Sequence, residues 1–231
     1  MSKIITFGNQ KGGVGKSTIT CMCANALSAE PFNYKVCVID NDRQQSIYEA
    51  RSFDIEGSEV QPPYPVWSMQ TDELIKAIQQ LDESYDLIFI DTPGKLDVQA
   101  PAVQQEVTKT LAYCDYMFIP FKGGSFNMDA TLQYLQFLMK LQEKRSASAR
   151  PLNIWGFINM YRQRSRVHRH LVQEVRHLKD NGLPFMVNRL GNYTTFEEVD
   201  TINSYYDEDT NDTGKLNFTV WLSELHKILT Q

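Results

Sequence analysis

The chain has 231 residues, of which 42% are hydrophobic, and its formal net charge is −5. This length permits a large buried core, and we expect a single domain over residues 1–231. The N-terminus lacks the charged-then-apolar layout of a signal peptide, and no apolar run approaches the roughly 18 residues needed to cross a bilayer. We therefore expect a cytoplasmic protein, and the net acidity by itself argues against nucleic-acid binding.

Apolar runs rich in β-branched and aromatic residues alternate with helical patterns, which predicts an α/β fold with a mostly parallel central sheet and helices on both faces. Predicted strands cover residues 3–8, 35–40, 64–68, 86–91, 115–121, 153–159 and 184–188. Predicted helices cover residues 16–29, 44–52, 71–82, 97–113, 127–145 and 165–181. An exposed acidic loop at 205–214 and an amphipathic terminal helix complete the chain. Such sheets bind ligands at the carboxyl ends of their strands.

The segment after the first predicted strand reads Lys-Gly-Gly-Val-Gly-Lys-Ser-Thr and has the composition of a phosphate-binding loop. Its glycines allow successive backbone N–H groups to turn around a polyphosphate, and the following helix directs its positive end at the same charge. Lys16 is placed to reach the β- and γ-phosphates, and the Ser17 hydroxyl to ligate Mg²⁺. The predicted nucleotide-binding residues of the loop are Gly12, Gly13, Val14, Gly15, Lys16, Ser17 and Thr18.

The loop departs from the strict P-loop pattern at its first position, where Gln10 replaces glycine and a second lysine, Lys11, follows. This arrangement resembles the deviant Walker A motif of the ParA/MinD group of P-loop ATPases. In that group the first lysine crosses a dimer interface to the partner's nucleotide. The resemblance therefore implies an ATPase that binds ATP and Mg²⁺ and forms a homodimer around ATP, with Lys11 and Lys16 as catalytic residues.

The second predicted strand ends in two carboxylates, Asp40 and Asp42, which an extended segment would direct the same way. The segment resembles the Walker A′ motif of the group, usually Asp-x-Asp-Pro-Gln. By that match Asp42 positions the attacking water as a catalytic residue, and Asp40 helps to hold the Mg²⁺ region. Arg43 stands where the group commonly has proline. Two solvent-facing turn aspartates are the alternative interpretation.

A later buried strand ends in Asp91, the Walker B pattern, and Thr92–Gly94 follows it. Although a lone aspartate at a strand end is often a helix cap, behind a P-loop it is the expected Mg²⁺ ligand. The segment 92–94 resembles switch II, with the Gly94 N–H free to approach the γ-phosphate.

Asn159, at the end of another predicted strand, matches the asparagine of the group whose amide reads the adenine edge. An ordinary strand-end turn asparagine is the alternative.

Basic residues concentrate at 162–179, where six arginines and lysines face one acid, so this window carries +5 and the rest of the chain −10. The resemblance implies that the ATP-bound dimer binds DNA nonspecifically. We assign this binding to Arg162, Arg164, Arg166 and Arg169, which would contact phosphates without reading bases. A solvated helix face is the alternative.

Together these motifs resemble a small ParA-type partition ATPase without the N-terminal helix-turn-helix extension of larger relatives. The resemblance implies a nucleoid-associated protein that segregates a plasmid, chromosome or other cargo and hydrolyses ATP when a ParB-like adaptor stimulates it. A MinD-like membrane-surface ATPase is the alternative. It is disfavoured because the terminal helix around Trp221 offers Lys227 and His226 against Glu224 in place of a strongly basic face, so we expect that helix to pack in the core. Iron–sulfur relatives require paired or interface cysteines, and the four cysteines form no C-x-x-C pair.

Overall fold

A computed structural model of the chain describes residues 1–57, 59, 61–94, 100–148 and 150–231, with backbone alone at 125 and 126. Within these residues, parallel strands form one sheet in the order β3-β2-β4-β1-β5-β6. The strands are β1 (Lys3–Phe7), β2 (Val36–Asp40), β3 (Val66–Ser68), β4 (Leu87–Asp91), β5 (Tyr116–Phe121) and β6 (Asn153–Ile158). Because β1 pairs with β4 on one side and β5 on the other, the loop that follows β1 leaves the middle of the sheet.

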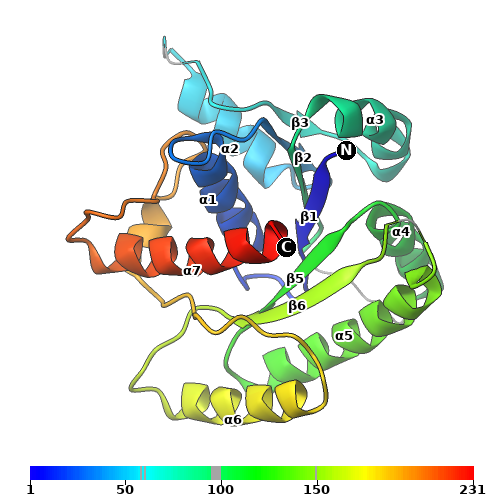
Figure 1. The fold of residues 1–231 in the computed structure, drawn as a ribbon, viewed down its shortest axis with the longest axis vertical. Coiled ribbons are helices and arrows are strands. Elements are labelled where there is room, and N and C mark those ends of the chain that lie inside the picture. Colours follow the sequence, from blue (N-terminus) through cyan, green and yellow to red (C-terminus); the bar gives the residue numbers. More distant parts are fainter. Residues whose placement is uncertain (58, 60, 95–99, 149) are drawn as a thin grey trace.

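Helices cover both faces of the sheet (Figure 1). They are α1 (Lys16–Ser28), α2 (Ser46–Ile55), α3 (Thr71–Ser84), α4 (Pro101–Leu111), α5 (Ser125–Arg145), α6 (Arg166–Asp180) and α7 (Thr213–Leu229), with a 3-10 helix η1 at Thr194–Glu198. One core cluster joins α1, α2 and α7 to one face, and a second joins α3, α4, α5 and α6 to the other. The predicted α/β fold class is therefore confirmed.

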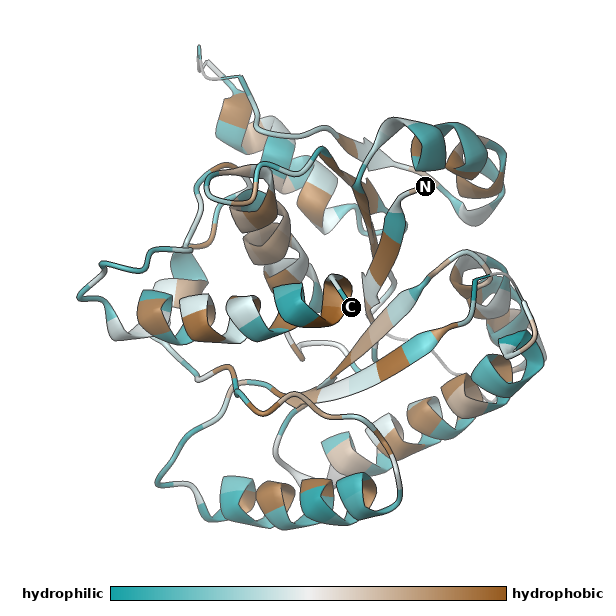
Figure 2. Ribbon diagram, viewed as in Figure 1, coloured by the Kyte–Doolittle hydropathy of each residue, from teal (hydrophilic) through white to brown (hydrophobic). Residues whose placement is uncertain are grey.

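The two cores follow from the alternation of side chains along the strands, which directs successive residues to opposite faces of the sheet. Figure 2 shows hydrophobic residues, in brown, in the sheet and in the helices that cover it. Ile5 and Phe7 of β1 belong to the cluster with α1 and α7, whereas Ile4 belongs to the opposite cluster. Trp221 of α7 is fully buried, and its ring centroid lies 5.1 Å from that of Phe157 and 6.3 Å from that of Phe7. The expectation that the terminal helix packs in the core is confirmed. None of the described helices is both long and apolar enough to span a membrane.

The strand predicted at 184–188 is wrong, because this segment makes only an isolated bridge between Gly156 and Phe185. Pro184 has no N–H to donate to a ladder. The Met186 N–H donates to the Gly156 carbonyl at 2.9 Å as part of the bridge. The N–H groups of Val187 and Asn188 that follow are taken by the carboxylate of Glu224 on α7, at 2.5 and 2.7 Å. A side chain from a distant helix thus replaces the pairing partner that a strand would need.

Two further boundaries differ from the sequence prediction. Helix α4 begins at Pro101, a residue suited to a first helical position, and residues 97–99 of the predicted helix lie outside the described residues. Helix α7 begins at Thr213 because Asp212 caps it, accepting the Lys215 N–H at 2.8 Å. The acidic loop therefore ends before Gly214, and its first residue, Tyr205, is buried.

Candidate functional site

The loop between β1 and α1 has the backbone of an anion cradle. Gly13 and Gly15 adopt φ angles of +68° and +87°, which residues with a Cβ rarely tolerate. Gly15 is the N-cap residue of α1, and no side-chain cap is present among the described residues, so the first-turn N–H groups are available for a ligand. Buried Asn9 anchors the loop, donating to the Pro120 carbonyl at 3.1 Å and accepting the Lys11 N–H at 3.0 Å. The sequence motif did not include Asn9, although its position directly before the loop could have suggested it.

The two lysines of the loop lie in different environments. Lys16 is 6% exposed, and burial lowers the pKa of its ammonium while the nearby carboxylates of Asp91 and Asp42 act in the opposite direction. A Cβ added to Gly94 would lie 3.4 Å from Lys16 Nζ, which places the ammonium directly under the segment after β4. Lys11 is exposed, and within the described chain its side chain makes no hydrogen bond or ion pair. Lys16 is therefore part of the cradle, whereas Lys11 is free to reach outward.

Asp91 and Ser17 form an oxygen-rich pair below the cradle. Ser17 Oγ donates to Asp91 Oδ2 at 2.6 Å, and the other carboxylate oxygen, Oδ1, is buried without a hydrogen-bond partner in the described structure. Burial raises the pKa of Asp91 to about 7. An unsatisfied carboxylate oxygen beside a hydroxyl fits Mg²⁺, which prefers oxygen ligands. Among the described residues, no three His, Cys, Asp or Glu side chains are placed to hold a metal ion together. The Ser17–Asp91 pair still suits Mg²⁺, which usually relies on one or two carboxylates with waters and substrate phosphates.

Asp40 lies next to Asp91 in register, on the neighbouring strand β2, and is fully buried. Its Oδ2 accepts the N–H groups of Ile47 and Tyr48 at 2.9 and 3.1 Å, and its Oδ1 accepts the Asp42 N–H at 3.1 Å. Burial raises the pKa of this carboxyl, opposed by these three hydrogen bonds. The structure therefore gives Asp40 a capping role at the start of α2, which the sequence did not indicate.

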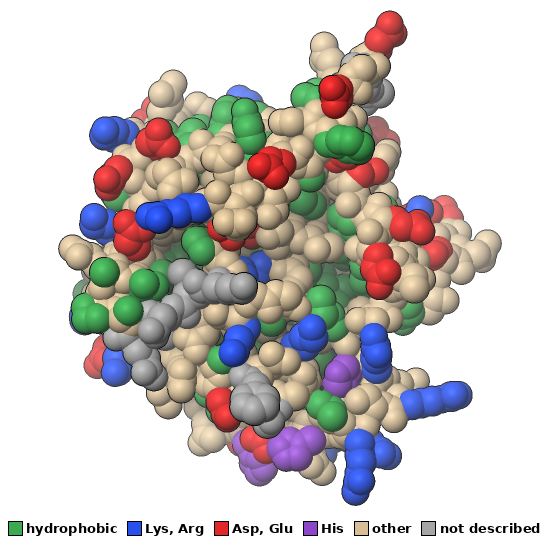
Figure 3. Space-filling model, turned by 180° about the vertical axis from the view of Figure 1, so that it is seen from behind, with side chains coloured by type: hydrophobic (Ala, Val, Ile, Leu, Met, Phe, Trp, Pro, Cys, Tyr) green, Lys and Arg blue, Asp and Glu red, His purple; other side chains and the backbone are tan. Residues whose placement is uncertain are grey.

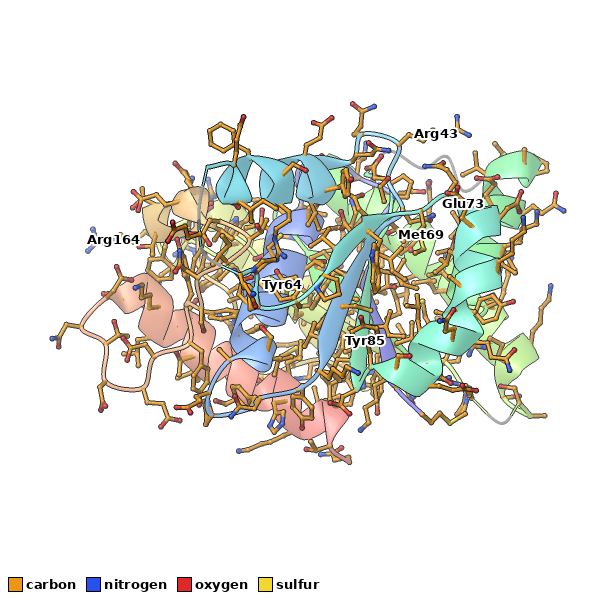
Figure 4. The ribbon with its side chains drawn as sticks, turned by 90° about the horizontal axis from the view of Figure 1, so that it is seen from above. Arg43, Tyr64, Met69, Glu73, Tyr85 and Arg164 are labelled. Carbon is orange, nitrogen blue, oxygen red and sulfur yellow. The ribbon has the colours of Figure 1, made fainter. Side chains whose placement is uncertain are left out.

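Asp42 links the segment after β2 to the segment after β4. Its Oδ1 accepts the Gln44 N–H at 3.0 Å, and its Oδ2 accepts the Gly94 N–H at 3.3 Å. The structure thus brings together two residues 52 positions apart that the sequence assigned to one site. Arg43, which replaces the usual proline, is exposed and lies at the periphery in Figure 4.

A cavity of about 200 Å³ lies beside Gly15 and Thr18 of the phosphate-binding loop. Asn159 lines it and donates through Nδ2 to the Val14 carbonyl at 2.7 Å, so this amide braces the loop. The wall opposite is formed by Gly191, Tyr193 and the residues around them. The sequence analysis missed this wall, because no motif marks the segment and only the fold brings it to the loop.

The four arginines assigned to DNA binding lie together around the start of α6. All four are exposed, and none has an ion-pair partner in the described part of the chain. They are Arg162 and Arg164 in the loop before α6, and Arg166 and Arg169 on α6 itself. Figure 3 shows Lys, Arg and His side chains gathered at the lower edge, where Figure 1 places α6, and the labelled Arg164 extends beyond the ribbon in Figure 4.

The surface formed by these four arginines, called the basic surface below, is connected to the phosphate cradle. Lys122, just after β5, donates through Nζ to the Gly13 carbonyl at 3.0 Å. The next residue, Gly123, packs so closely on the His168 ring that a Cβ there would lie 2.4 Å from it. His168 Nδ1 in turn accepts the Arg162 N–H at 2.6 Å. The start of the basic surface is therefore held against the loop that follows β1.

Comparison with known proteins agrees with this geometry. Residues 5–192 match the family described as the CobQ/CobB/MinD/ParA nucleotide binding domain. An uncharacterized protein of Methanocaldococcus jannaschii, MJECL24, is 25% identical, with 77% of this chain and 81% of that protein covered. A plasmid partition protein from Borrelia burgdorferi has a similar structure, with a TM-score of 0.70, 22% identity and coverage of 98% and 99%. The ATP complex of a Cyanothece McdA variant also gives a TM-score of 0.70, with 15% identity and coverage of 97% and 96%.

Proposed function

Because the chain belongs to the CobQ/CobB/MinD/ParA nucleotide binding domain family, we propose that it is an ATP-dependent, dimerising switch ATPase. It binds DNA nonspecifically and segregates or positions a plasmid, chromosome or other cargo. The observation that carries this proposal is the uncapped start of α1 above buried Lys16, beside an Asp91 carboxylate with an unsatisfied oxygen. Such an arrangement suits a nucleoside triphosphate accompanied by a divalent cation.

ATP is the substrate, and each segment of the site has a part in binding it. The backbone of Gly12–Thr18 surrounds the phosphates, and Lys16 pairs with the β- and γ-phosphates. Ser17 and Asp91 hold Mg²⁺, with Asp40 supporting that region by fixing the start of α2. When bound, Mg²⁺ neutralises negative charge on the phosphate oxygens. The adenine occupies the cavity beside Asn159, whose remaining amide groups read its edge while one N–H braces the loop.

Hydrolysis depends on Asp42 and Gly94. We assign to Asp42 the positioning of the attacking water, and to the Gly94 N–H a contact with the γ-phosphate. In the described structure these two groups bond each other at 3.3 Å, so triphosphate binding would exchange one partner of Gly94 for another. A ParB-like adaptor stimulates hydrolysis. Loss of the γ-phosphate then releases the switch segment at 92–94, and the rearrangement that follows ends DNA binding.

The test of the proposed function is retention of DNA by the purified protein. We expect a DNA fragment of arbitrary sequence to be retained with ATP and Mg²⁺ and released with ADP. Binding that is equally strong with both nucleotides, or absent with both, would contradict the DNA-binding switch. Co-sedimentation with anionic vesicles under the same conditions tests the membrane-surface alternative, which the core-packed α7 does not favour.

Lys11→Ala is expected to bind ATP with nearly unchanged affinity but to remain monomeric. The side chain of Lys11 is exposed and makes no hydrogen bond or ion pair with the described residues, so its loss leaves the cradle intact. A partner's nucleotide would lose a charged contact. Sedimentation velocity with a non-hydrolysable ATP analogue measures this. A normal ATP-dependent dimer would show that Lys11 does not act across an interface.

Reversing the charge of Arg164 and Arg166 together is expected to eliminate DNA binding while dimerisation is preserved. Both side chains are exposed and unpaired within the described residues, so their replacement by glutamate removes phosphate contacts and adds repulsion without disturbing the core. DNA retention and sedimentation are measured on the same preparation. If the double variant still retains DNA like the wild type, the binding surface lies elsewhere.

A further inference from the structure

Two consecutive carbonyl groups of the phosphate-binding loop are held from outside by side chains that follow neighbouring strands. Lys122 comes directly after β5 and donates through Nζ to the Gly13 carbonyl at 3.0 Å. Asn159 comes directly after β6 and donates through Nδ2 to the Val14 carbonyl at 2.7 Å. Because β5 and β6 pair in parallel up to their last residues, the two donors leave the sheet at neighbouring positions.

Each of these hydrogen bonds fixes the direction of an N–H group of the loop. In a trans peptide the C=O and N–H groups point in opposite directions, so a carbonyl turned toward an outside donor turns the N–H of the next residue away from that donor. The Gly13 carbonyl orients the Val14 N–H in this way, and the Val14 carbonyl orients the Gly15 N–H. Neither N–H has a hydrogen-bond acceptor within the described residues. They belong to the loop whose N–H groups cradle the α- and β-phosphates of a nucleotide.

The position of Lys122 is fixed by its neighbours on both sides. Phe121, fully buried at the end of β5, accepts the Asn159 N–H at 2.9 Å. Gly123 packs on the His168 ring, as described above, and has no room for a Cβ. The side chain of Lys122 is partly exposed and forms no ion pair in the described part of the chain, so no carboxylate there competes with the loop carbonyl for its ammonium.

We propose that Lys122 is a positioning residue of the nucleotide site. It binds the Gly13 carbonyl and thereby holds the Val14 N–H toward the phosphates, as Asn159 does for the Gly15 N–H. The loop needs such a brace because glycine, here with a φ of +68° at position 13, has many accessible conformations. This inference rests on the proposed function and deepens it, because it adds a residue that lies outside the motifs from which the site was identified.

The experiment measures the affinities for ADP and for inorganic tripolyphosphate by displacement of a fluorescent ADP analogue. Lys122→Met keeps the length of the side chain without a donor. It is expected to lower both affinities by the same factor, about tenfold, which corresponds to roughly one hydrogen bond. Tripolyphosphate reports on the cradle alone, because it has no base to occupy the cavity beside Asn159. Lys122→Arg keeps a charged donor and should remain within about threefold of the wild type.

Lys140→Met is the matched control and should leave both affinities unchanged. It removes one exposed lysine from α5, about 22 Å along the helix from its start. Titrations at 1 M salt separate the hydrogen bond from attraction between charges, because the Debye length there is about 3 Å. The deficit of Lys122→Met should persist under these conditions. Thermal unfolding followed by circular dichroism establishes that the variants are folded.

Three outcomes would overturn the inference while the proposed function stands. The first is wild-type affinity of Lys122→Met for both ligands, whether or not the variant still dimerises with ATP. The second is a deficit that disappears at 1 M salt or that Lys140→Met shares, which would reveal only attraction between charges. The third is a loss of affinity for ADP alone, or one that Lys122→Arg shares, which would indicate a structural disturbance away from the phosphates. A wild type that binds neither ligand would contradict the nucleotide site of the proposed function, and this inference with it.

Discussion

Lys16→Ala is expected to lower the affinity for ATP by at least about 100-fold. The variant loses two charge-assisted hydrogen bonds to the phosphates, each of which contributes roughly 1.5–3 kcal/mol, and each 1.4 kcal/mol is a factor of about ten in affinity. The ammonium of Lys16 is 6% exposed and lies beneath Gly94, whereas Lys11 is exposed and Lys122 is bonded to the Gly13 carbonyl, so we expect neither of these to take its place. Its removal also leaves the carboxylates of Asp91 and Asp42 without their compensating charge just where the phosphates must bind.

Titration with a fluorescent ATP analogue measures this loss, and Lys11→Ala is the matched control. Both variants remove one lysine of the same loop, yet only Lys16 is buried in the cradle. Circular dichroism establishes that both remain folded. If Lys16→Ala binds the analogue within threefold of the wild type, the phosphates do not lie in this loop.

The sequence predicted most of the fold because its strands are short apolar runs separated by clear turns. The ends of β1, β2 and β4 carry their functional residues directly, so the cradle, the Asp40–Asp42 pair and Asp91–Gly94 could be identified from local sequence. Parallel pairing then brings the ends of β2 and β4 together, with Asp40 opposite Asp91. Site residues that belong to strand ends are therefore predictable once the sheet is recognised.

The remainder depends on contacts between distant segments. The apolar residues at 184–188 suggested a strand, but the pairing was prevented by Glu224, which lies 36 residues from Asn188. Capping of α2 by Asp40 requires the turn after β2 to fold back, which composition does not specify. The cavity wall at Gly191 and Tyr193 gave no signal in the sequence, because no motif marks the segment and only the fold brings it beside Asn159.

Asp42→Ala is expected to bind ATP normally while hydrolysis falls by about 10²–10⁴-fold, the usual contribution of a residue that positions or activates the attacking water. The variant should therefore accumulate an ATP-bound dimer that remains on DNA. The carboxylate accepts N–H groups from Gln44 and Gly94, so alanine also removes two hydrogen bonds, at a cost of roughly 0.5–1.5 kcal/mol each in stability.

Asp42→Asn separates these two effects in part. Asparagine carries no negative charge, and its single amide oxygen can still accept one of the two N–H groups, which the aspartate accepts on separate oxygens. Phosphate release and dimer lifetime are measured for both variants, with Asp209→Ala, an exposed carboxylate of the acidic loop, as the control. We expect Asp42→Asn to be as inactive in hydrolysis as Asp42→Ala and more stable to heat. An asparagine variant that hydrolyses ATP at the wild-type rate would show that hydrolysis does not need the negative charge of Asp42, and the positioning of water would then belong to another residue.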